Sequence, residues 1–569
     1  MSLKHISSIR QMNRTEFLTW IDEGMGFLPL ALTNRKLINP FELGPDQLAP
    51  AIVINMREPS TGTRISFEYG GRIMGCHAIT IEGVSSSSAK KGEPVDEMME
   101  RLYLQAGARF FAIRNPVAGL IQALAETFDQ DRRPETMMGN DVSFFNAGEG
   151  KRYHSTQVGM DKLMEVSWDL FPEAIRSGRQ SFIDAIAMFR QKPVAERHEI
   201  IAEKLNSLTE AYVGDSGHSR IAYDGMWLGT EDMFPGMQFH LVGPPEFRIK
   251  AKLLQHVVHV TSSERLTSAV PTRKVYMIRH QLERMEQFFS QAMVREVHAS
   301  LECDQEVLDG LDERPDDVIV LDALPFNKEI RTIPRAVQNH PRVVYRFQAA
   351  CSGAIRAAAI KLGWMNQSDR WRVPESSPIE LQLLQDAKSL AQHQKEYDEK
   401  HKDIPGRVHR LDNGTVLDHI PDGMSRFFDD LLERHGLGNL HVIPSRNAPS
   451  PSISALKDIM FFPDTFLHQL CPALLQTFQL FAPDMVTNVF DKANDAFLKY
   501  RVGMPSRLVG TVRCTGGEDC IDNHRGEADV VSRFDTFGDS KNPSWRCGFC
   551  GEVSDNTAMR KRMAKHADD

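Results

Sequence analysis

The sequence lacks long hydrophobic runs and contains few cysteines. No window of the 569 residues holds the roughly 18 consecutive apolar residues that a membrane-spanning helix needs. The start of the chain also lacks the apolar stretch and cleavage site of a secretory signal peptide. Eight cysteines in this length are too few for a secreted protein held together by disulfides. We therefore expect a protein of a reducing compartment, the cytoplasm, with no membrane partner.

A strong excess of charge of one sign is also absent. The chain has 67 basic and 76 acidic side chains, a net charge of −9. This balance excludes a globally basic coat for nucleic acid but permits a local basic face. Hydrophobic residues at 41% and charged residues at 25% are typical of folded proteins. A chain of this length predicts three or four domains.

Common catalytic motifs are missing. The sequence has no phosphate-binding loop ending in Gly-Lys-Ser/Thr, no Gly-x-Gly-x-x-Gly, no His-Glu-x-x-His and no Gly-x-Ser-x-Gly. Val318–Asp322 is predicted to be a strand ending in an acid, and without a phosphate-binding loop it does not indicate nucleotide hydrolysis. Gly214–Gly217 reads Gly-Asp-Ser-Gly, as in the nucleophile loop of trypsin-like serine proteases. It follows a predicted helix, however, and we interpret it as a turn. The sequence thus predicts no catalytic residues.

Apolar periodicity predicts a multidomain α+β protein with a mostly helical middle region. Near the N-terminus, Ala51–Met56 and Arg64–Tyr69 are predicted strands, the second followed by a Gly-Gly turn. Asp484–Tyr500 is predicted to be an amphipathic helix. Asn413-Gly414 is a strong hairpin signal.

Four domains follow from these patterns and from shifts in charge. The expected divisions are an α+β N-terminal domain (1–150), a mainly helical domain (151–310), a mixed helical domain with a basic block and a β-hairpin near 407–420 (311–504), and a C-terminal zinc-ribbon-like β module with a basic tail (505–569).

The C-terminal cysteines predict a metal site. Half of the eight cysteines lie between 514 and 550, and Cys547-Gly-Phe-Cys550-Gly551 has the spacing and the following glycine of a zinc knuckle. Together with Cys514 at the end of a predicted strand, this arrangement resembles a zinc ribbon. Cys520, separated from Cys514 by five residues, is the expected fourth ligand, and His524 is the alternative. Four protein ligands leave no open position, so we expect a structural Zn²⁺.

A basic block follows an acidic stretch in the middle of the chain. Residues 296–322 contain ten acidic side chains and one arginine, whereas 327–372 contain nine basic and two acidic side chains. Arginine forks bind phosphate, and the interleaved aromatic rings can stack on bases. The alternative is that the arginines are solvated or pair with the acidic stretch. The candidate nucleic-acid-binding residues are Arg342, Arg346, Arg356, Lys361, Arg370 and Arg372.

Zinc, a basic block and missing catalytic motifs together predict a non-catalytic, zinc-stabilised subunit of a nucleic-acid-handling complex, such as a transcription or replication accessory subunit. Its expected partners are other protein subunits and DNA or RNA. The first alternative is a structural or assembly protein, such as a viral shell or nucleoprotein component. The second alternative is an enzyme whose motif is unfamiliar.

Overall fold

The computed structural model describes residues 3–565, apart from 45, 84–87, 131–140, 279–289, 325, 327–330, 372–373, 401, 403–410, 441–442, 450–455, 525 and 529. The chain forms two compact units, Met1–Arg372 with Glu518–Asp529, and Val373–Gly517 with Val530–Asp569. Residues 150 and 310 lie inside the first unit and residue 504 inside the second, so the four-domain division stays a prediction. No helix in the described part is both long and apolar enough to cross a bilayer.

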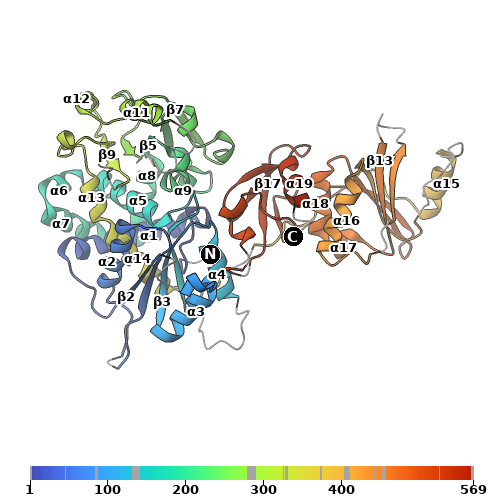
Figure 1. Cartoon of the computed structure of the whole chain (residues 1–569), viewed down its shortest axis with the longest axis horizontal. Helices are drawn as coiled ribbons and strands as arrows, with labels where there is room; N and C mark the ends of the chain where they lie inside the picture. The colour runs from blue at the N-terminus through green and yellow to red at the C-terminus, as the bar shows by residue number, and fades with distance from the viewer. Residues whose placement is uncertain are drawn as a thin grey trace. The chain divides into compact units, whose positions relative to one another are not determined.

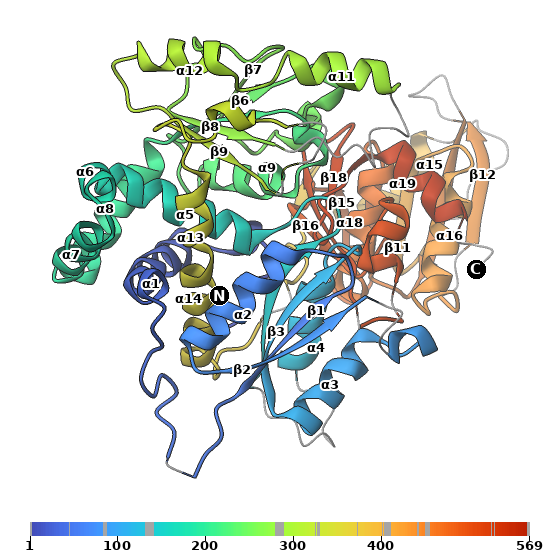
Figure 2. The same cartoon turned by 60° about the vertical axis from the view of Figure 1, so that its left-hand side comes forward.

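The first unit contains a four-stranded parallel sheet with the order β2-β1-β3-β4. The strands are β1 (Ala51–Met56), β2 (His77–Glu82), β3 (Ala108–Asn115) and β4 (Ser143–Glu149). They are connected by α2 (Thr61–Ile73), α3 (Val95–Ala106) and α4 (Leu120–Asp129). The chain moves outward from β1 to β2 and then crosses back to β3. Right-handed connections therefore place α2 on one face and α3 and α4 on the other (Figures 1 and 2).

A second parallel sheet in the same unit has the order β7-β6-β5-β8-β9. The strands are β5 (Thr209–Val213), β6 (Gln238–Val242), β7 (His259–Ser263), β8 (Lys274–Met277) and β9 (Ile319–Asp322). The chain reverses direction across this sheet between β5 and β8. Val213 of β5, Val275 of β8 and Val320 of the edge strand β9 are buried in one hydrophobic cluster.

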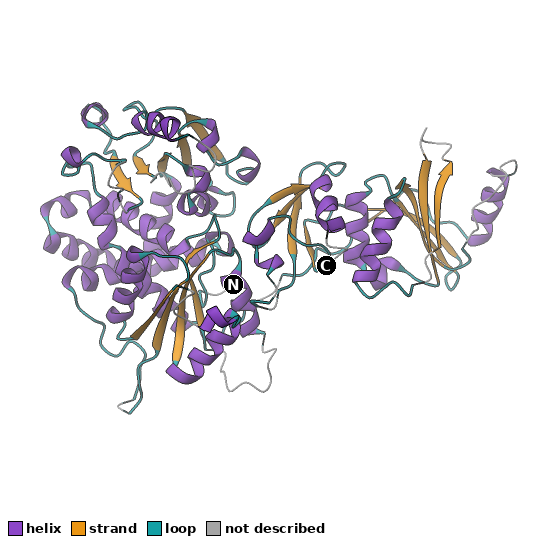
Figure 3. Ribbon diagram, viewed as in Figure 1, coloured by secondary structure: helices purple, strands orange, loops and turns teal. Residues whose placement is uncertain are grey.

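Helices pack around both sheets of the first unit (Figure 3). Three of them, α1 (Arg14–Thr33), α5 (Ser155–Leu170) and α14 (Ser352–Met365), pack against one another. Asn13 begins α1 with a capping box, in which its side chain accepts from the backbone of Glu16 and the Glu16 carboxylate accepts in return. The indole of Trp20 on α1 donates to the carbonyl of Ile355 on α14 at 3.1 Å. These contacts fix the helices that support the cavity described below.

The predicted fold class is confirmed as multidomain, but α+β is wrong for the first unit. Its two sheets are parallel and alternate with helices, which makes it an α/β fold. The region 151–310, which was predicted to be mainly helical, carries four strands of the five-stranded sheet, β5 to β8. Its strands are four or five residues long, and a short buried run such as Ala211–Val213 cannot be distinguished from a helix by periodicity. Arg64–Tyr69, predicted to be a strand, lies within α2.

The second unit contains a six-stranded antiparallel sheet with the order β10-β15-β14-β11-β13-β12. The strands are β10 (Leu381–Leu383), β11 (Gly414–Pro421), β12 (Ile443–Pro449), β13 (Leu456–Pro463), β14 (Val486–Asp491) and β15 (Ala496–Val502). Phe428 of α16 (Met424–Arg434) stacks on Phe478 of α18 (Pro472–Phe481) at 4.2 Å. A separate antiparallel sheet contains β16 (Arg507–Val509), β17 (Arg533–Phe537), β18 (Ser544–Cys547) and β19 (Val553–Asp555).

Two local predictions in the second unit differ from the structure. Asp484–Tyr500, predicted to be a helix, contains strand β14 and most of β15, which pair with each other. Of the predicted hairpin near 407–420, residues 407–410 lie outside the described residues. The described part is β11, which pairs with β13 and β14, strands far along the chain.

Candidate active site

A cavity of about 1190 Å³ lies in the first unit, where strands of both parallel sheets end. Its walls include residues that end or follow six strands. These are Thr63 after β1, Arg114 of β3, His154 after β4, Arg220 after β5, Ile278 after β8 and Asp322 of β9. In open parallel sheets, ligands bind at the carboxyl ends of strands, at the point where the strand order reverses. Both reversals, β1/β3 and β5/β8, contribute to this cavity.

The N-terminus of α2 forms one part of the wall. Ser60 precedes the helix in an extended conformation, and its side chain makes no capping bond to the backbone. Its hydroxyl donates instead to Thr63 Oγ1 at 2.9 Å. Thr61 and Gly62 are exposed, and a Cβ on Gly62 would meet nothing within 4 Å. The first-turn amides and the helix dipole therefore favour an anion here.

Two arginines converge beside this helix terminus. Arg114 Nη1 donates to the carbonyl of Ala147 at 3.2 Å, and Arg220 Nε donates to the carbonyl of Gly150 at 2.6 Å. Gly148, between those two carbonyls, has φ +113°, and a Cβ there would lie 2.4 Å from Arg114 Nη1 and 3.3 Å from Arg220 Nη1. Only glycine permits this approach of both guanidinium groups to the main chain. Glu58 pairs with Arg220 at 2.5 Å and lies 3.7 Å from Arg114.

His154 lies behind the same helix terminus and is uncharged. Its Nε2 is 3.3 Å from Thr63 Oγ1, and its Nδ1 is buried without a hydrogen-bond partner among the described residues. Burial, followed by the charges of Arg114, Arg356 and Arg220, holds its pKa well below the usual range. The buried carboxylate of Asp224 accepts from the backbone of His154 at 3.1 Å and fixes the turn. A neutral imidazole in this position can hydrogen-bond a carbonyl oxygen.

Arg356 brings a further positive charge to the cavity. The side chain is 1% exposed, stacks over the ring of Phe67, and donates from Nη1 to the carbonyl of Ser352 at 3.1 Å. Its Nε has no hydrogen-bond partner among the described residues, and burial lowers the pKa of Arg356 to about 10. A buried cation without a carboxylate partner is costly. The cavity is therefore suited to a ligand with several negative charges.

The other candidate nucleic-acid-binding residues do not gather at this cavity. Arg342 pairs with Asp312 of the acidic stretch at 2.5 Å, and Lys361 pairs with Glu23 at 2.8 Å. Arg346 donates to the carbonyl of Gln338, and Arg370 to nearby carbonyls. Arg372 lies outside the described residues. The Gly-Asp-Ser-Gly turn, from which no catalytic residue was predicted, lies just before Ser219 and Arg220, which line the cavity.

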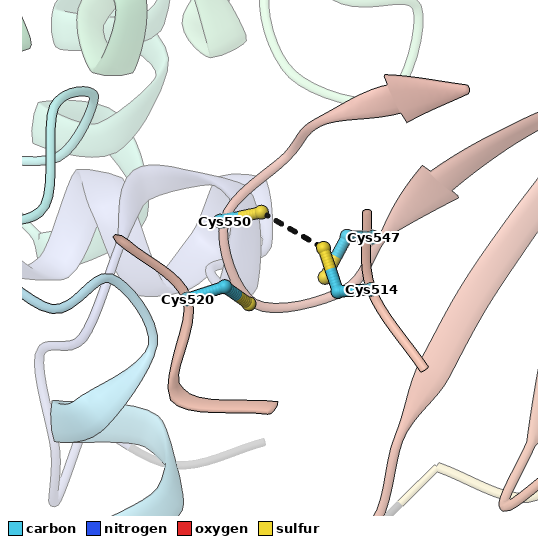
Figure 4. Close-up of side chains that lie close together, drawn as sticks. All are labelled: Cys514, Cys520, Cys547 and Cys550. Atoms are coloured by element: carbon cyan, nitrogen blue, oxygen red, sulfur yellow. Dashed lines mark hydrogen bonds between the residues drawn. The ribbon is translucent and has the colours of Figure 1, made fainter. Parts of the chain in front are cut away.

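Four cysteines form the second chemical cluster. The sulfur atoms of Cys514, Cys520, Cys547 and Cys550 all lie within 4.8 Å of one another (Figure 4), and the group does not include His524. Cys514 Sγ is 3.5 Å from Cys550 Sγ. The backbone amides of Gly516 and Phe549 donate to Cys514 and Cys547. All four side chains are buried, and together they can hold a metal ion.

Comparison with known proteins finds a family match in the N-terminal part of the chain. Residues 4–165 match the family model described as aspartate/ornithine carbamoyltransferase, carbamoyl-P binding domain. This stretch contains α2, Arg114 and His154.

Curated relatives extend the similarity. An aspartate carbamoyltransferase catalytic subunit from Synechococcus elongatus is 28% identical over 242 residues, 42% of this chain and 59% of the relative's length. One from Desulforudis audaxviator is 27% identical over 371 residues, 65% of this chain and all of the relative. One from Corynebacterium jeikeium is 34% identical over 160 residues, 28% of this chain and 45% of the relative.

Solved structures are also similar. The catalytic subunit of M. jannaschii aspartate transcarbamoylase has 20% identity and a TM-score of 0.45, over 63% of this chain and 97% of that one. Trypanosoma cruzi aspartate transcarbamoylase in complex with N-(phosphonacetyl)-L-aspartic acid has 19% identity and a TM-score of 0.46, over 63% of this chain and 95% of that one.

These findings overturn the predicted function. A non-catalytic subunit for transcription or replication is wrong, because the family model describes an enzyme domain and the relatives are catalytic subunits. The viral and nucleic-acid-binding interpretations are wrong for the same reason. Of the alternatives, the enzyme of unfamiliar motif is the one that the comparisons support. The motif was unfamiliar because its residues come from six separate strand ends.

Proposed function

We propose that the first unit transfers the carbamoyl group of carbamoyl phosphate to the amino group of aspartate. The observation that carries this proposal is the match of residues 4–165 to the carbamoyl-P binding domain. Residues 4–165 include the exposed N-terminus of α2 and Arg114 beside it. Names of the curated relatives support aspartate as the acceptor.

The cationic end of the cavity suits carbamoyl phosphate. A phosphoryl group at the N-terminus of α2 receives backbone amides, and Arg114 neutralises its charge. The neutral His154 and the hydroxyl of Thr63 can hold the carbamoyl oxygen, where negative charge develops when an amine attacks the carbonyl carbon. Positive charge near the leaving phosphate stabilises it as the carbon–oxygen bond breaks. Arg356 and Arg220 supply further charge for the two carboxylates of aspartate.

Product formation from carbamoyl phosphate and aspartate tests this proposal. We expect the full chain to form carbamoyl aspartate and inorganic phosphate in equal amounts. Arg114→Ala should lower kcat/KM by roughly 10²-fold or more, the loss measured for one group that stabilises an oxyanion. Arg101→Ala is the matched control, because this exposed arginine pairs with Glu93 on the surface and should leave kcat/KM unchanged. A wild-type chain that forms no product at saturating substrate would contradict the proposal.

We also propose that the four-cysteine cluster holds a structural Zn²⁺. Tetrahedral zinc with four thiolates at about 2.3 Å requires sulfur atoms roughly 3.8 Å apart. The separations in the cluster suit this geometry. Amides that donate to the sulfurs favour the thiolate form. Cys520 is the proposed fourth ligand in place of His524.

The relatives' description as catalytic subunits leads us to propose that the chain works in an assembly with other subunits. A cytoplasmic location stays a prediction.

A further inference from the structure

A single carboxylate faces the otherwise cationic cavity. Among the described lining residues, the cations are Arg72, Arg114, Arg220 and Arg356, and the one carboxylate is Asp322. Asp322 is the last residue of β9, at the edge where substrates of open parallel sheets bind. The apolar side chains of Leu324 and Ile278 line the wall beside it. An acidic group at such a position requires an explanation.

The contacts of Asp322 hold the carboxylate in one orientation. Oδ1 accepts from the backbone amide of Leu324 at 2.7 Å, and Oδ2 accepts from the hydroxyl of Thr332 at 2.5 Å. Leu324 has φ +37°, so the turn after β9 is strained for a residue with a side chain. The backbone amide of Asp322 donates to Gln348 Oε1 at 3.4 Å. Each carboxylate oxygen retains a second lone pair for a ligand.

Burial makes Asp322 a weaker acid than a surface aspartate. It raises the pKa of Asp322 to about 6, while the hydrogen bonds from Thr332 and Leu324 act in the opposite direction. On β8, the ionisable neighbour is Tyr276, and Lys274 at the far end of that strand pairs with Asp169. Other ionisable groups among the described residues lie on α13 (Tyr345–Ala350) and in the segment before it. Tyr345 lines the cavity, Arg346 donates to a carbonyl, Arg331 lies over Phe326, and His340 and Arg342 pair with Asp312.

Carbamoyl transfer requires a proton acceptor in this cavity. The acceptor amine enters as an ammonium, which has no lone pair with which to attack. Guanidinium groups cannot take its proton, and His154 has a pKa too low to hold one near neutral pH. Among the described lining residues, Asp322 is the group that is ionised near neutral pH and basic enough to act.

We propose that Asp322 is the general base that receives the proton of the acceptor's ammonium group. This inference rests on the proposed carbamoyl transfer. The carboxylate first orients the ammonium by a charge-assisted hydrogen bond and takes one proton. The freed nitrogen lone pair forms the bond to the carbamoyl carbon, and the bond from that carbon to the phosphate oxygen breaks with its electron pair. The nitrogen's second excess proton goes to the departing phosphate, and Asp322 returns its proton to solvent.

If Asp322 had only a structural role, its substitution by asparagine would have a different effect than if it were a general base. Asparagine has the same shape, can accept from the amide of Leu324, and can donate to the hydroxyl of Thr332. A turn that only needs a hydrogen-bonding cap therefore tolerates Asp322→Asn. A general base does not, because an amide cannot take a proton. The single variant Asp322→Asn therefore distinguishes a structural role from the role of general base.

The test is the pH dependence of kcat/KM for aspartate in the full chain. Wild type should lose activity as the pH falls through about 6, where Asp322 becomes protonated. Asp322→Asn should lower kcat by roughly 10²-fold or more and abolish this acidic limb. Binding of carbamoyl phosphate, measured by calorimetry, and the melting temperature should stay unchanged.

Thr332→Val provides a second, independent readout. Losing the hydroxyl that stabilises the carboxylate raises the pKa of Asp322, so the acidic limb should move to higher pH while the plateau above it is kept. A capping role would not move the limb. Full activity with an unchanged limb in Asp322→Asn would overturn the inference and leave the proposed transfer standing. Wild type without carbamoyl transfer, but with normal binding of inorganic phosphate, would overturn the transfer and this inference with it.

Discussion

At the scale of single residues, the cavity could not be predicted because its chemistry is scattered along the chain. Arg114, His154, Arg220 and Asp322 end or follow four different strands, and each is unremarkable in its own stretch of sequence. Only the order of the strands brings them together. The cysteine cluster is the opposite case, since its four residues lie within 37 positions and their spacing predicted the grouping that the structure has.

A buried ion cluster in the first unit depends on one lysine. Lys162 Nζ donates to Glu165 at 3.0 Å and to Glu210 at 2.5 Å, and all three side chains are at most 1% exposed. Burial opposes the charge of Lys162, but the two carboxylates outweigh it and raise its pKa. Burial and the charge of Glu210 raise the pKa of Glu165 well above its usual range. The lysine is thus the cluster's main counter-charge.

Lys162→Met should destabilise the chain by about 3–5 kcal/mol, because it removes the cation that pairs with both buried carboxyl groups. Glu165, whose pKa burial already raises, should then be protonated in the folded state, so its folded pKa exceeds the unfolded one. Stability of the variant should therefore rise as the pH falls, and the gap from wild type should be smaller at pH 5 than at pH 8. Chemical denaturation at pH 5 and at pH 8 measures the free energy of unfolding of the variant and of wild type.

The matched control is Lys192→Met, which removes an exposed i,i+4 partner of Glu196. Its effect should stay below about 0.5 kcal/mol. Equal, small effects of both substitutions would show that the buried cluster needs no cation.

At the scale of elements, the decisive error concerned α2. Ile65-Ser-Phe-Glu-Tyr69 alternates like a strand, and Gly70-Gly71 resembles the turn after it. In the structure both glycines lie inside the helix, where a Cβ would lie 2.9 Å from Arg356 Cβ and 2.9 Å from Ile52 Cγ2. Tertiary packing therefore explains these glycines. Because the glycines were interpreted as a turn, the helix N-terminus at the cationic end of the cavity was not predicted. The strand Ala51–Met56 was predicted correctly because its apolar run is continuous.

Close approach of α1 and α5 gives an element-scale prediction. A Cβ on Gly159 of α5 would lie 2.5 Å from the ring of Trp20, which is fully buried. Gly159→Ala should therefore force the helices apart and lower the free energy of unfolding by about 1–3 kcal/mol. Gly526→Ala is the control, because a Cβ there meets nothing within 4 Å. Denaturant titration compares the free energies of unfolding of the two variants. A Gly159→Ala variant more stable than wild type would contradict the packing argument.

At the scale of the whole molecule, the chain joins an α/β unit with parallel sheets to a unit with antiparallel sheets. The first carries the catalytic proposal and the second carries the small sheet β16–β19. That sheet has short strands, two of them three residues long, and thus a limited core. A metal staple is a common source of stability for such a sheet.

We expect one zinc per chain in protein purified without added metal, measured by elemental analysis. Cys547→Ser removes one of four ligands and should abolish tight binding. Metal binding is coupled to folding at such sites, so amide hydrogen exchange should then accelerate in β17 and β18 while β1 and β3 keep their protection. Cys471→Ser is the matched control, because Cys471 is outside the cluster and should leave the zinc content unchanged. If wild-type protein contains no zinc and its β17 and β18 are still fully protected from amide hydrogen exchange, the proposed structural zinc is contradicted, because the small sheet is then stable through its own packing.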